Sequence, residues 1–239
     1  MREGLFMIQK PMFSPQVEWL PPTEFPDLSK YDEIAIDLET KDPELKTMGS
    51  GSVTGRGEIV GIAVAVQDWS GYYPIRHEGG GNMDIKIVLK WFQDILETPS
   101  MKIFHNAMYD VCFIRSEGLR IDGTIVDTMI AGSLVDENRF RYDLGSMGRD
   151  FVGRGKNETI LSETAKEWGI DAKSEMYKLP AMYVGEYAEA DAKLTLELWQ
   201  EMKKEIISQD IEDIFNLETE LFPCLVDMRF LGVRVDTQA

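Results

Sequence analysis

Hydrophobic residues in the first half of the chain follow the patterns of β-strands. Residues 31–40 carry Ile34 and Ile36 at alternate positions, as a half-buried strand does. Residues 58–66 form a continuous, β-branched apolar run that is typical of a buried strand. Three shorter segments complete the predicted strands: residues 71–75 as a hairpin partner, residues 101–104, and residues 121–126.

Apolar residues recur at helical spacing in the other long segments. Residues 83–96 show this spacing, and residues 107–117 form a predicted helix that ends at Gly118. Two longer helices are predicted at 181–207 and 211–231. Because strands come first and helices dominate later, the pattern indicates a mixed-sheet α/β domain or an α+β domain.

Two segments lack regular patterning. Residues 1–29 are rich in proline, which favours an extended arm docked on the domain over a helix or a strand. Residues 41–57 contain a Gly/Ser stretch, which predicts a flexible loop. This stretch is not a phosphate-binding loop, because no Lys-Ser or Lys-Thr pair ends it and no helical pattern follows.

The net charge limits the partners that the chain can bind. Its 239 residues include 42 acidic and 25 basic ones, which give a formal net charge of −17. This charge argues against an unselective basic coat for nucleic acid, although nucleic acid can still bind where cations or a local basic patch neutralise the contact. Two cysteines and two histidines argue against a disulfide scaffold and a zinc cluster. The longest apolar run is too short to span a bilayer, so no membrane partner is expected.

Three acidic pieces of the sequence stand out together. Asp37 and Glu39 end the first predicted strand, and residues two apart on a strand point to the same face. Asp110 lies in the first turn of a predicted helix, where the helix dipole stabilises a carboxylate even without a functional role. Tyr187 and Asp191 are four positions apart on a long predicted helix and therefore share one of its faces.

In order and spacing, these pieces resemble the three motifs of the DEDD superfamily of 3′→5′ exonucleases, in its tyrosine-containing subgroup. The arrangement is similar to the proofreading domain of family A DNA polymerases. The resemblance implies a ribonuclease H-like α/β fold, a mixed central sheet flanked by helices, over residues 30–207. Residues 208–239 resemble the start of the polymerase domain, and the lack of polymerase motifs after them implies a truncated chain or a split gene. The lack of room for a 5′-nuclease domain before residue 30 resembles phage-type members.

The resemblance also implies a role for each motif residue. Tyr187 would orient the attacking water, and Thr40 and Asn106 would contact the terminal nucleotides. Two divalent ions, Mg²⁺ or Mn²⁺, would be held by four carboxylates: Asp37, Glu39, Asp110 and Asp191. Each pair of carboxylates about 4–6 Å apart costs roughly 3–4 kcal/mol at an effective dielectric near 20. Such a cluster stays ionised only with cations, and oxygen ligands suit these hard ions.

The implied activity is metal-dependent release of 5′-mononucleotides from a single-stranded or frayed DNA 3′ end. It would take place in the cytoplasm, or in the host cytoplasm if a phage encodes the chain. A polymerase domain, in cis or in trans, is the implied partner. Two alternatives remain: a stand-alone exonuclease that trims RNA, and a non-catalytic module that binds nucleic acid or a polymerase. The second alternative normally goes with lost carboxylates, whereas all four are present.

Other residues near the motifs have two interpretations each. Asp127 is either a fifth acid of the site or a helix cap, and the cap is favoured. Residues 138–156 are locally basic and either follow phosphates or form a solvated loop of mixed charge. Core packing is favoured over catalysis or base stacking for the remaining ones: His105, Cys112, Phe140, Tyr142 and Phe151.

Overall fold

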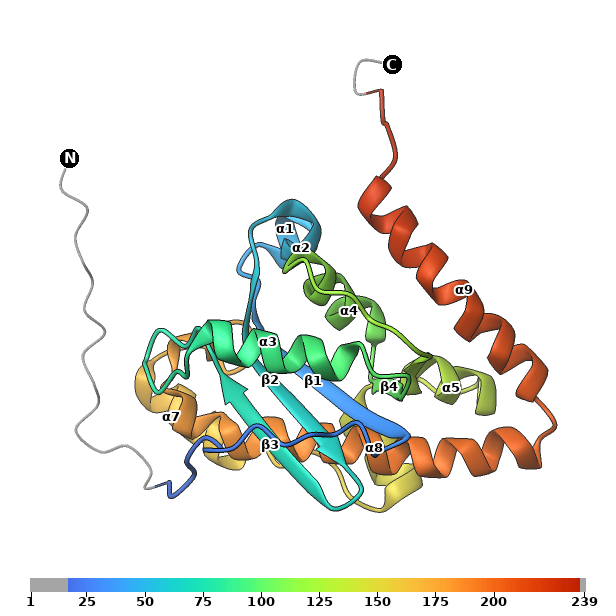
Figure 1. The fold of residues 1–239 in the computed structure, drawn as a ribbon, viewed down its shortest axis with the longest axis horizontal. Helices are drawn as coiled ribbons and strands as arrows, with labels where there is room; N and C mark the ends of the chain where they lie inside the picture. The colour runs from blue at the N-terminus through green and yellow to red at the C-terminus, as the bar shows by residue number, and fades with distance from the viewer. Residues whose placement is uncertain (1–16, 237–239) are drawn as a thin grey trace.

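Five strands form a mixed sheet in the order β3-β2-β1-β4-β5 (Figure 1). The computed structural model describes residues 17–236. β1 pairs antiparallel with β2 and parallel with β4, so it lies where the two kinds of pairing meet. The strands are β1 (Glu33–Lys41), β2 (Glu58–Val66), β3 (Trp69–Pro74), β4 (Met101–Phe104) and β5 (Ile125–Asp127).

Helices cover both faces of this sheet, which confirms the predicted α/β architecture (Figure 1). α3 (Ile85–Leu96) and α4 (Ala107–Ser116) pack on one face, and the long α8 (Gly185–Ser208) packs on the other. α9 (Glu212–Leu231) follows α8. The shorter helices are α1 (Leu45–Met48), α2 (Gly51–Thr54), α5 (Thr128–Val135), α6 (Leu144–Met147), η1 (Gly148–Val152), α7 (Thr159–Trp168), η2 (Met176–Lys178) and η3 (Ala181–Tyr183).

The side chains of β1 alternate between the two faces of the sheet, and this alternation decides where the acidic residues lie. Ala35 belongs to the core beneath α8. Asp37 and Glu39 follow at the same parity, so they point to the same face as Ala35. The other face of β1 is apolar and buried in the core beneath α3 and α4: Ile34, Ile36 and Leu38.

Small residues let α8 approach the sheet closely. Buried alanines line both surfaces of this core: Ala35, Ala63 and Ala65 on the strands, and Ala188 and Ala192 on the helix. Because these alanines place little bulk between the two backbones, longer side chains of α8 can reach β1. Tyr187 and Asp191 are such side chains, and the helix therefore carries them to the acidic end of β1.

Two segments differ from the predicted pattern. The strand predicted at 121–126 is limited to the short β5, because Gly123 turns the chain with a φ of +78°. The loop that was expected to be flexible contains the one-turn helices α1 and α2. The amide of Gly51 donates to Asp42 Oδ1 at 3.1 Å, and an added Cβ at Gly51 would lie 2.6 Å from Gly57 Cα. Gly51 and Gly57 therefore serve close packing.

The described part of the N-terminal arm is extended and lies against the sheet. Phe25 packs on Tyr73 of β3, with ring centroids 5.3 Å apart. The indole Nε1 of Trp19 donates to Glu189 Oε1 of α8 at 2.9 Å. Residues 1–16 of the expected arm lie outside the described residues.

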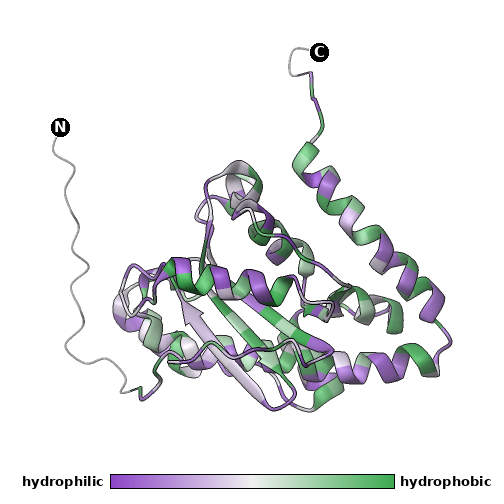
Figure 2. Cartoon of the chain, in the orientation of Figure 1, coloured by the Kyte–Doolittle hydropathy of each residue, from purple (hydrophilic) through white to green (hydrophobic). Residues whose placement is uncertain are grey.

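One face of α9 packs against the body and the other is exposed. Phe215, Phe222 and Val226 are buried. Six apolar residues of α9 are exposed: Ile214, Leu217, Leu221, Leu225, Met228 and Leu231. Hydrophobic and hydrophilic residues therefore alternate along the helix in Figure 2. Despite this apolar face, no helix among residues 17–236 is long and apolar enough to cross a bilayer.

Candidate active site

The four carboxylates of the sequence motifs lie in one cluster. Asp37 and Glu39 come from β1, Asp110 from the first turn of α4, and Asp191 from α8. The backbone amide of Leu38 donates to Asp110 Oδ1 at 3.0 Å, which joins α4 to the strand between the two acids. The charge of Asp37 acts on both Glu39 and Asp110. Asp191 acts on Asp37 in turn, so Asp37 lies within electrostatic reach of each of the other three acids.

A β-bulge shapes the end of β1. The register shifts between Glu39 and Thr40, and bulges of this kind re-aim side chains next to active sites. Glu39 pairs with Gly61 on β2, and Asp37 pairs with Ala63. Both acids therefore have a small cross-strand neighbour on β2.

Gly61 makes room for a buried aromatic side chain on the face of the sheet that carries the acids. An added Cβ at Gly61 would lie 2.0 Å from the hydroxyl of Tyr72. That hydroxyl lies 2.7 Å from His77 Nε2, and His77 Nδ1 lies 2.9 Å from the carbonyl oxygen of Leu179. Burial lowers the pKa of His77 to about 4, so the imidazole is neutral. Its Nδ1–H donates to Leu179, and its Nε2 accepts from Tyr72.

Burial makes the ionised form of the clustered acids costly. Asp110 and Asp191 are buried, whereas Asp37 and Glu39 keep partial exposure. Burial, reinforced by the charge of Asp191, raises the pKa of Asp37 to about 7. Burial and the charge of Asp37 raise the pKa of Glu39 and of Asp110 well above their ordinary ranges. The cluster therefore carries its full charge at neutral pH only if cations offset it.

The donors of the cluster suit a hard divalent ion. All four side chains offer carboxylate oxygens, the ligands that Mg²⁺ and Mn²⁺ prefer. Among residues 17–236, no three His, Cys, Asp or Glu side chains are already arranged around a common ion position. The donor set therefore fits such ions chemically.

A lysine that the motifs did not single out lies inside this cluster. The Lys156 ammonium contacts Asp191 Oδ2 and donates to the Tyr187 hydroxyl at 3.0 Å. Burial acts to lower the pKa of Lys156, but the charges of Asp191 and Asp37 outweigh it and raise that pKa above its ordinary value. The only signal for Lys156 in the sequence is its place in the basic segment 138–156. Its contact with Asp191 depends on the fold and could not be predicted.

The Tyr187 phenol is held as a neutral hydroxyl beside Asp191. Burial, together with the charge of Asp191, raises the pKa of Tyr187 above its ordinary value. A phenol that keeps its proton at neutral pH can donate a hydrogen bond, but it cannot act as a general base. The surroundings of Tyr187 therefore suit it to positioning a neighbouring group.

The two expected substrate contacts are placed differently. Thr40 Oγ1 lies 2.8 Å from the Tyr109 hydroxyl, so its hydroxyl already has a protein partner. Asn106 is exposed at the start of α4, in a left-handed conformation with a φ of +63°. The Asp127 carboxylate supports this turn by accepting hydrogen bonds from the amides of Asn106 at 2.9 Å and Ala107 at 2.8 Å.

The remaining residues near the motifs mostly follow the favoured interpretation. Asp127 also accepts a hydrogen bond from the amide of Met129 at 2.8 Å and thereby caps α5. His105 Nδ1 lies 2.8 Å from the hydroxyl of Thr128, and burial lowers the pKa of His105 to about 4. Cys112 is buried in the core beneath α3 and α4. These three side chains therefore have structural partners.

The basic segment 138–156 is largely paired within the protein. Three of its cations have acidic partners: Arg139 with Asp150, Arg154 with Glu197, and Lys156 with Asp191. Tyr142 and Phe151 pack against the core beneath α8, as favoured. The prediction of core packing is wrong for Phe140. This side chain is fully exposed, because it lies in the turn between α5 and α6. These ion pairs favour the interpretation of residues 138–156 as a solvated loop of mixed charge.

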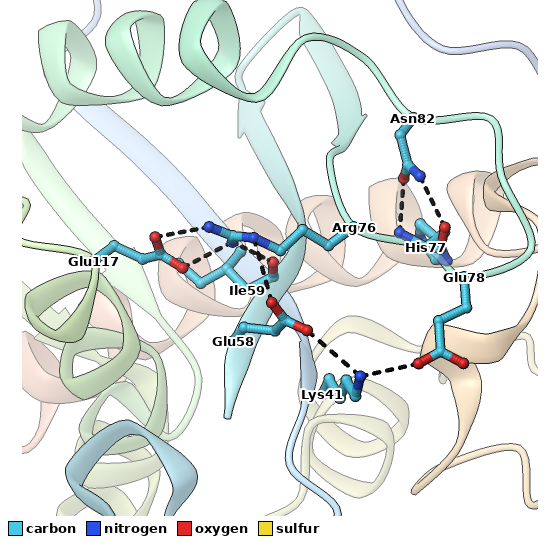
Figure 3. Close-up of polar contacts among 8 residues, drawn as sticks. All are labelled: Lys41, Glu58, Ile59, Arg76, His77, Glu78, Asn82 and Glu117. Carbon is cyan, nitrogen blue, oxygen red and sulfur yellow. Dashed lines mark hydrogen bonds and ion pairs between the residues drawn. The ribbon is translucent and has the colours of Figure 1, made fainter. Parts of the chain in front are cut away.

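A network of ion pairs joins the strand ends next to the acids (Figure 3). Lys41 Nζ, at the end of β1, lies 2.9 Å from Glu78 Oε1 and 3.6 Å from Glu58 Oε1. Arg76 Nη1 lies 2.8 Å from Glu117 Oε1, at the end of α4. These contacts tie together the ends of β1, β2 and α4 and the segment that follows β3.

The raised pKa of Asp37 predicts a pH-dependent difference in stability. The folded chain holds a proton on Asp37 up to about pH 7, whereas the unfolded chain loses it near 3.8. The stability that this group contributes is therefore lost as the pH rises through that window. In EDTA, we expect Asp37→Asn to gain stability relative to the unmodified chain as the pH rises from about 4 to about 7. Denaturant unfolding at each pH measures this difference, and a difference that does not change with pH would contradict the expectation.

Comparisons with known proteins agree with this geometry. A family model described as 3′-5′ exonuclease matches residues 25–207. A DNA-directed DNA polymerase of Pseudomonas phage M6 is 35% identical over 244 residues, which cover 96% of this chain and 36% of the phage protein. DNA polymerase I of Chloroflexus aurantiacus is 24% identical over 195 residues, which cover 76% of this chain and 19% of that polymerase. The chain thus spans about a third or less of these relatives.

Solved structures share the fold at low sequence identity. Brucella melitensis NrnC with bound Mg²⁺ aligns with a TM-score of 0.60 and 16% identity, over 89% of this chain and 92% of that one. Escherichia coli RNase D aligns with a TM-score of 0.55 and 17% identity, over 86% of this chain and 47% of that one. These likenesses show a ribonuclease H-like exonuclease fold. Because the family model covers most of its length and its relatives are polymerases, the chain belongs to the 3′-5′ exonuclease domain family of family A DNA polymerases.

Proposed function

We propose that the chain is a metal-dependent 3′-5′ exodeoxyribonuclease that proofreads for a DNA polymerase. It removes 5′-mononucleotides from a single-stranded or frayed 3′ end. The observation that carries this proposal is the meeting of carboxylates from β1, α4 and α8 beside the Tyr187 phenol. Buried acids with raised pKa values and too few cations of their own are typical of functional sites.

Each side chain has its own part in this proposal. Four carboxylates are the ligands of two divalent ions: Asp37, Glu39, Asp110 and Asp191. Such ions, when bound, supply a water of lowered pKa and positive charge near the phosphodiester. The Tyr187 hydroxyl donates a hydrogen bond that orients the attacking water. Asn106 and Thr40 flank the cluster at the start of α4 and the end of β1 and contact the terminal nucleotides.

Tyr187→Phe tests the positioning role. We expect the rate of terminal hydrolysis to fall by about 100-fold, with little change in binding of the strand, because the hydroxyl orients water and does not hold the DNA. Single-turnover digestion and fluorescence anisotropy on the same labelled oligonucleotide measure the two quantities. Tyr31→Phe is the control, because its hydroxyl contacts Asp68 away from the cluster. Equal losses in rate and in strand binding would contradict the positioning role.

The choice between DNA and RNA needs a direct comparison. A stand-alone exonuclease that trims RNA is the second candidate, because E. coli RNase D, described as an exoribonuclease, shares this fold. Matched DNA and RNA oligonucleotides with a 5′ label, incubated with Mg²⁺ or with EDTA, separate the two. We expect Mg²⁺-dependent shortening that is faster on DNA. Faster shortening of RNA would favour the second candidate, and shortening of neither strand would refute the catalytic proposal.

We further propose that residues 30–207 form the exonuclease domain behind an arm of residues 1–29, and that residues 208–239 lead into a polymerase domain in cis. The exposed apolar face of α9 supports this, because a face of that kind needs a partner surface. In a phage-infected cell, such a protein would act in the host cytoplasm. Sedimentation of the isolated chain at low and high concentration tests the role of α9. Self-association through this face is expected, and a monomer at every concentration would contradict it.

A further inference from the structure

Lys156 takes a place in the acidic cluster that the exonuclease motifs do not explain. Its ammonium contacts Asp191 Oδ2, donates to the Tyr187 hydroxyl at 3.0 Å, and lies 5.2 Å from the centre of the Tyr187 ring. The charges of Asp37 and Glu39 also act on it. Lys156 therefore pairs with Asp191 and also carries its charge within reach of two further carboxylates.

The positive charge of Lys156 reduces the repulsion among the carboxylates when metal ions are absent, and it is unfavourable when metal ions are bound. One ammonium offsets part of the charge of four carboxylates, whose mutual repulsion would otherwise be greater. Two divalent ions balance four carboxylates completely, so the ammonium would then be a surplus positive charge beside two cations. In addition, the Asp191 Oδ2 atom that contacts Lys156 is one of the two carboxylate oxygens that Asp191 can offer to an ion.

Lys156 is placed where its side chain can leave the cluster, and Asp191 is not. Lys156 lies in residues 153–158, which join η1 to α7 without regular secondary structure. Its side chain keeps 25% exposure, whereas that of Asp191 keeps 2% and is fixed on the long helix α8. The ammonium therefore has a path to solvent that the carboxylate lacks.

We propose that Lys156 is a built-in counter-cation that competes with divalent ions for Asp191. It pairs with Asp191 when ions are absent, and it is released to solvent when ions bind. The inference rests on the proposed metal-dependent function, because it requires that the cluster binds such ions.

Amine labelling of the unmodified chain tests the release of Lys156. A brief reaction with an amine-reactive ester in EDTA or in Mg²⁺, at equal ionic strength, is followed by peptide mass spectrometry. Lys156 should react several-fold faster in Mg²⁺ than in EDTA, because its ammonium has left Asp191. Lys193, exposed on α8, is the internal control and should react equally in both. Equal reactivity of Lys156 in both conditions would overturn the proposal.

Lys156→Met tests the competition, because methionine keeps an unbranched side chain and removes the charge. In EDTA, the variant should have a lower Tm than the unmodified chain, since the carboxylates lose their counter-charge. In calorimetric titrations, it should nevertheless bind Mn²⁺ about tenfold more tightly, since the competitor is gone. Arg154→Met is the matched control, because Arg154 belongs to the same segment but pairs with Glu197, and it should leave Mn²⁺ affinity unchanged.

The outcomes distinguish this inference from the proposed function. If the unmodified chain does not bind Mn²⁺, the proposed metal site is refuted and the competition with it. If the unmodified chain binds Mn²⁺ but Lys156→Met binds it equally or more weakly, the competition alone is refuted. If the variant does not fold in EDTA, the labelling of the unmodified chain still decides the question.

Discussion

Asp37→Ala should reduce Mg²⁺-dependent shortening of a single-stranded DNA 3′ end by about four orders of magnitude, while the chain stays folded. Asp37 is central to the cluster, because its charge acts on both Glu39 and Asp110. Its loss removes one of the four expected ligands of the two ions. Gel electrophoresis of a 5′-labelled oligonucleotide, digested under single-turnover conditions, measures the rate.

The same variant should be at least as stable as the unmodified chain in EDTA at neutral pH. Burial and the charge of Asp191 make ionised Asp37 costly, and alanine removes that cost. Asp94→Ala is the matched control, because Asp94 is exposed on α3 and pairs with Lys90 away from the cluster. The control should digest DNA at the full rate. If Asp37→Ala digests DNA as fast as the control, the assignment of the cluster is wrong.

Gly61→Ala should lower the free energy of unfolding by about 2 kcal/mol, within the range found for overpacked cores. The new Cβ would lie 2.0 Å from the Tyr72 hydroxyl. Tyr72 cannot move aside easily, because it is fully buried and its hydroxyl bonds His77, which is itself bonded to the Leu179 carbonyl. Denaturant unfolding measures the loss.

This strain should also reach the site, because Gly61 is the cross-strand partner of Glu39. We therefore expect Gly61→Ala to slow DNA shortening as well as to destabilise the chain. Gly145→Ala is the control, because its new Cβ would meet nothing closer than Asp143 Oδ1 at 3.4 Å. Its stability should stay within about 0.5 kcal/mol of the unmodified chain. Equal stability of the two variants would show that Tyr72 adjusts freely.

Local sequence patterns were sufficient for most of the elements. The β-branched run at 58–66 is β2, and the helical segment predicted at 107–117 is α4. The last predicted helix, at 211–231, is α9. These predictions succeed because alternation and helical spacing record which face of a single element is buried. The prediction of a flexible loop at 41–57 missed α1 and α2, because Gly51 and Gly57 serve close contacts that exist only in the packed fold.

In the candidate site, too, the direction of each side chain on its own element follows from the sequence, whereas the contacts between elements do not. The sequence by itself determined that Asp37 and Glu39 share a face of one strand, and that Tyr187 and Asp191 share a face of one helix, because periodicity sets the direction of a side chain relative to its own element. Only the tertiary structure decided what those faces meet. The approach of α8 across a layer of alanines, the bulge at the end of β1, and the contact of Lys156 with Asp191 all depend on packing between elements distant in the chain.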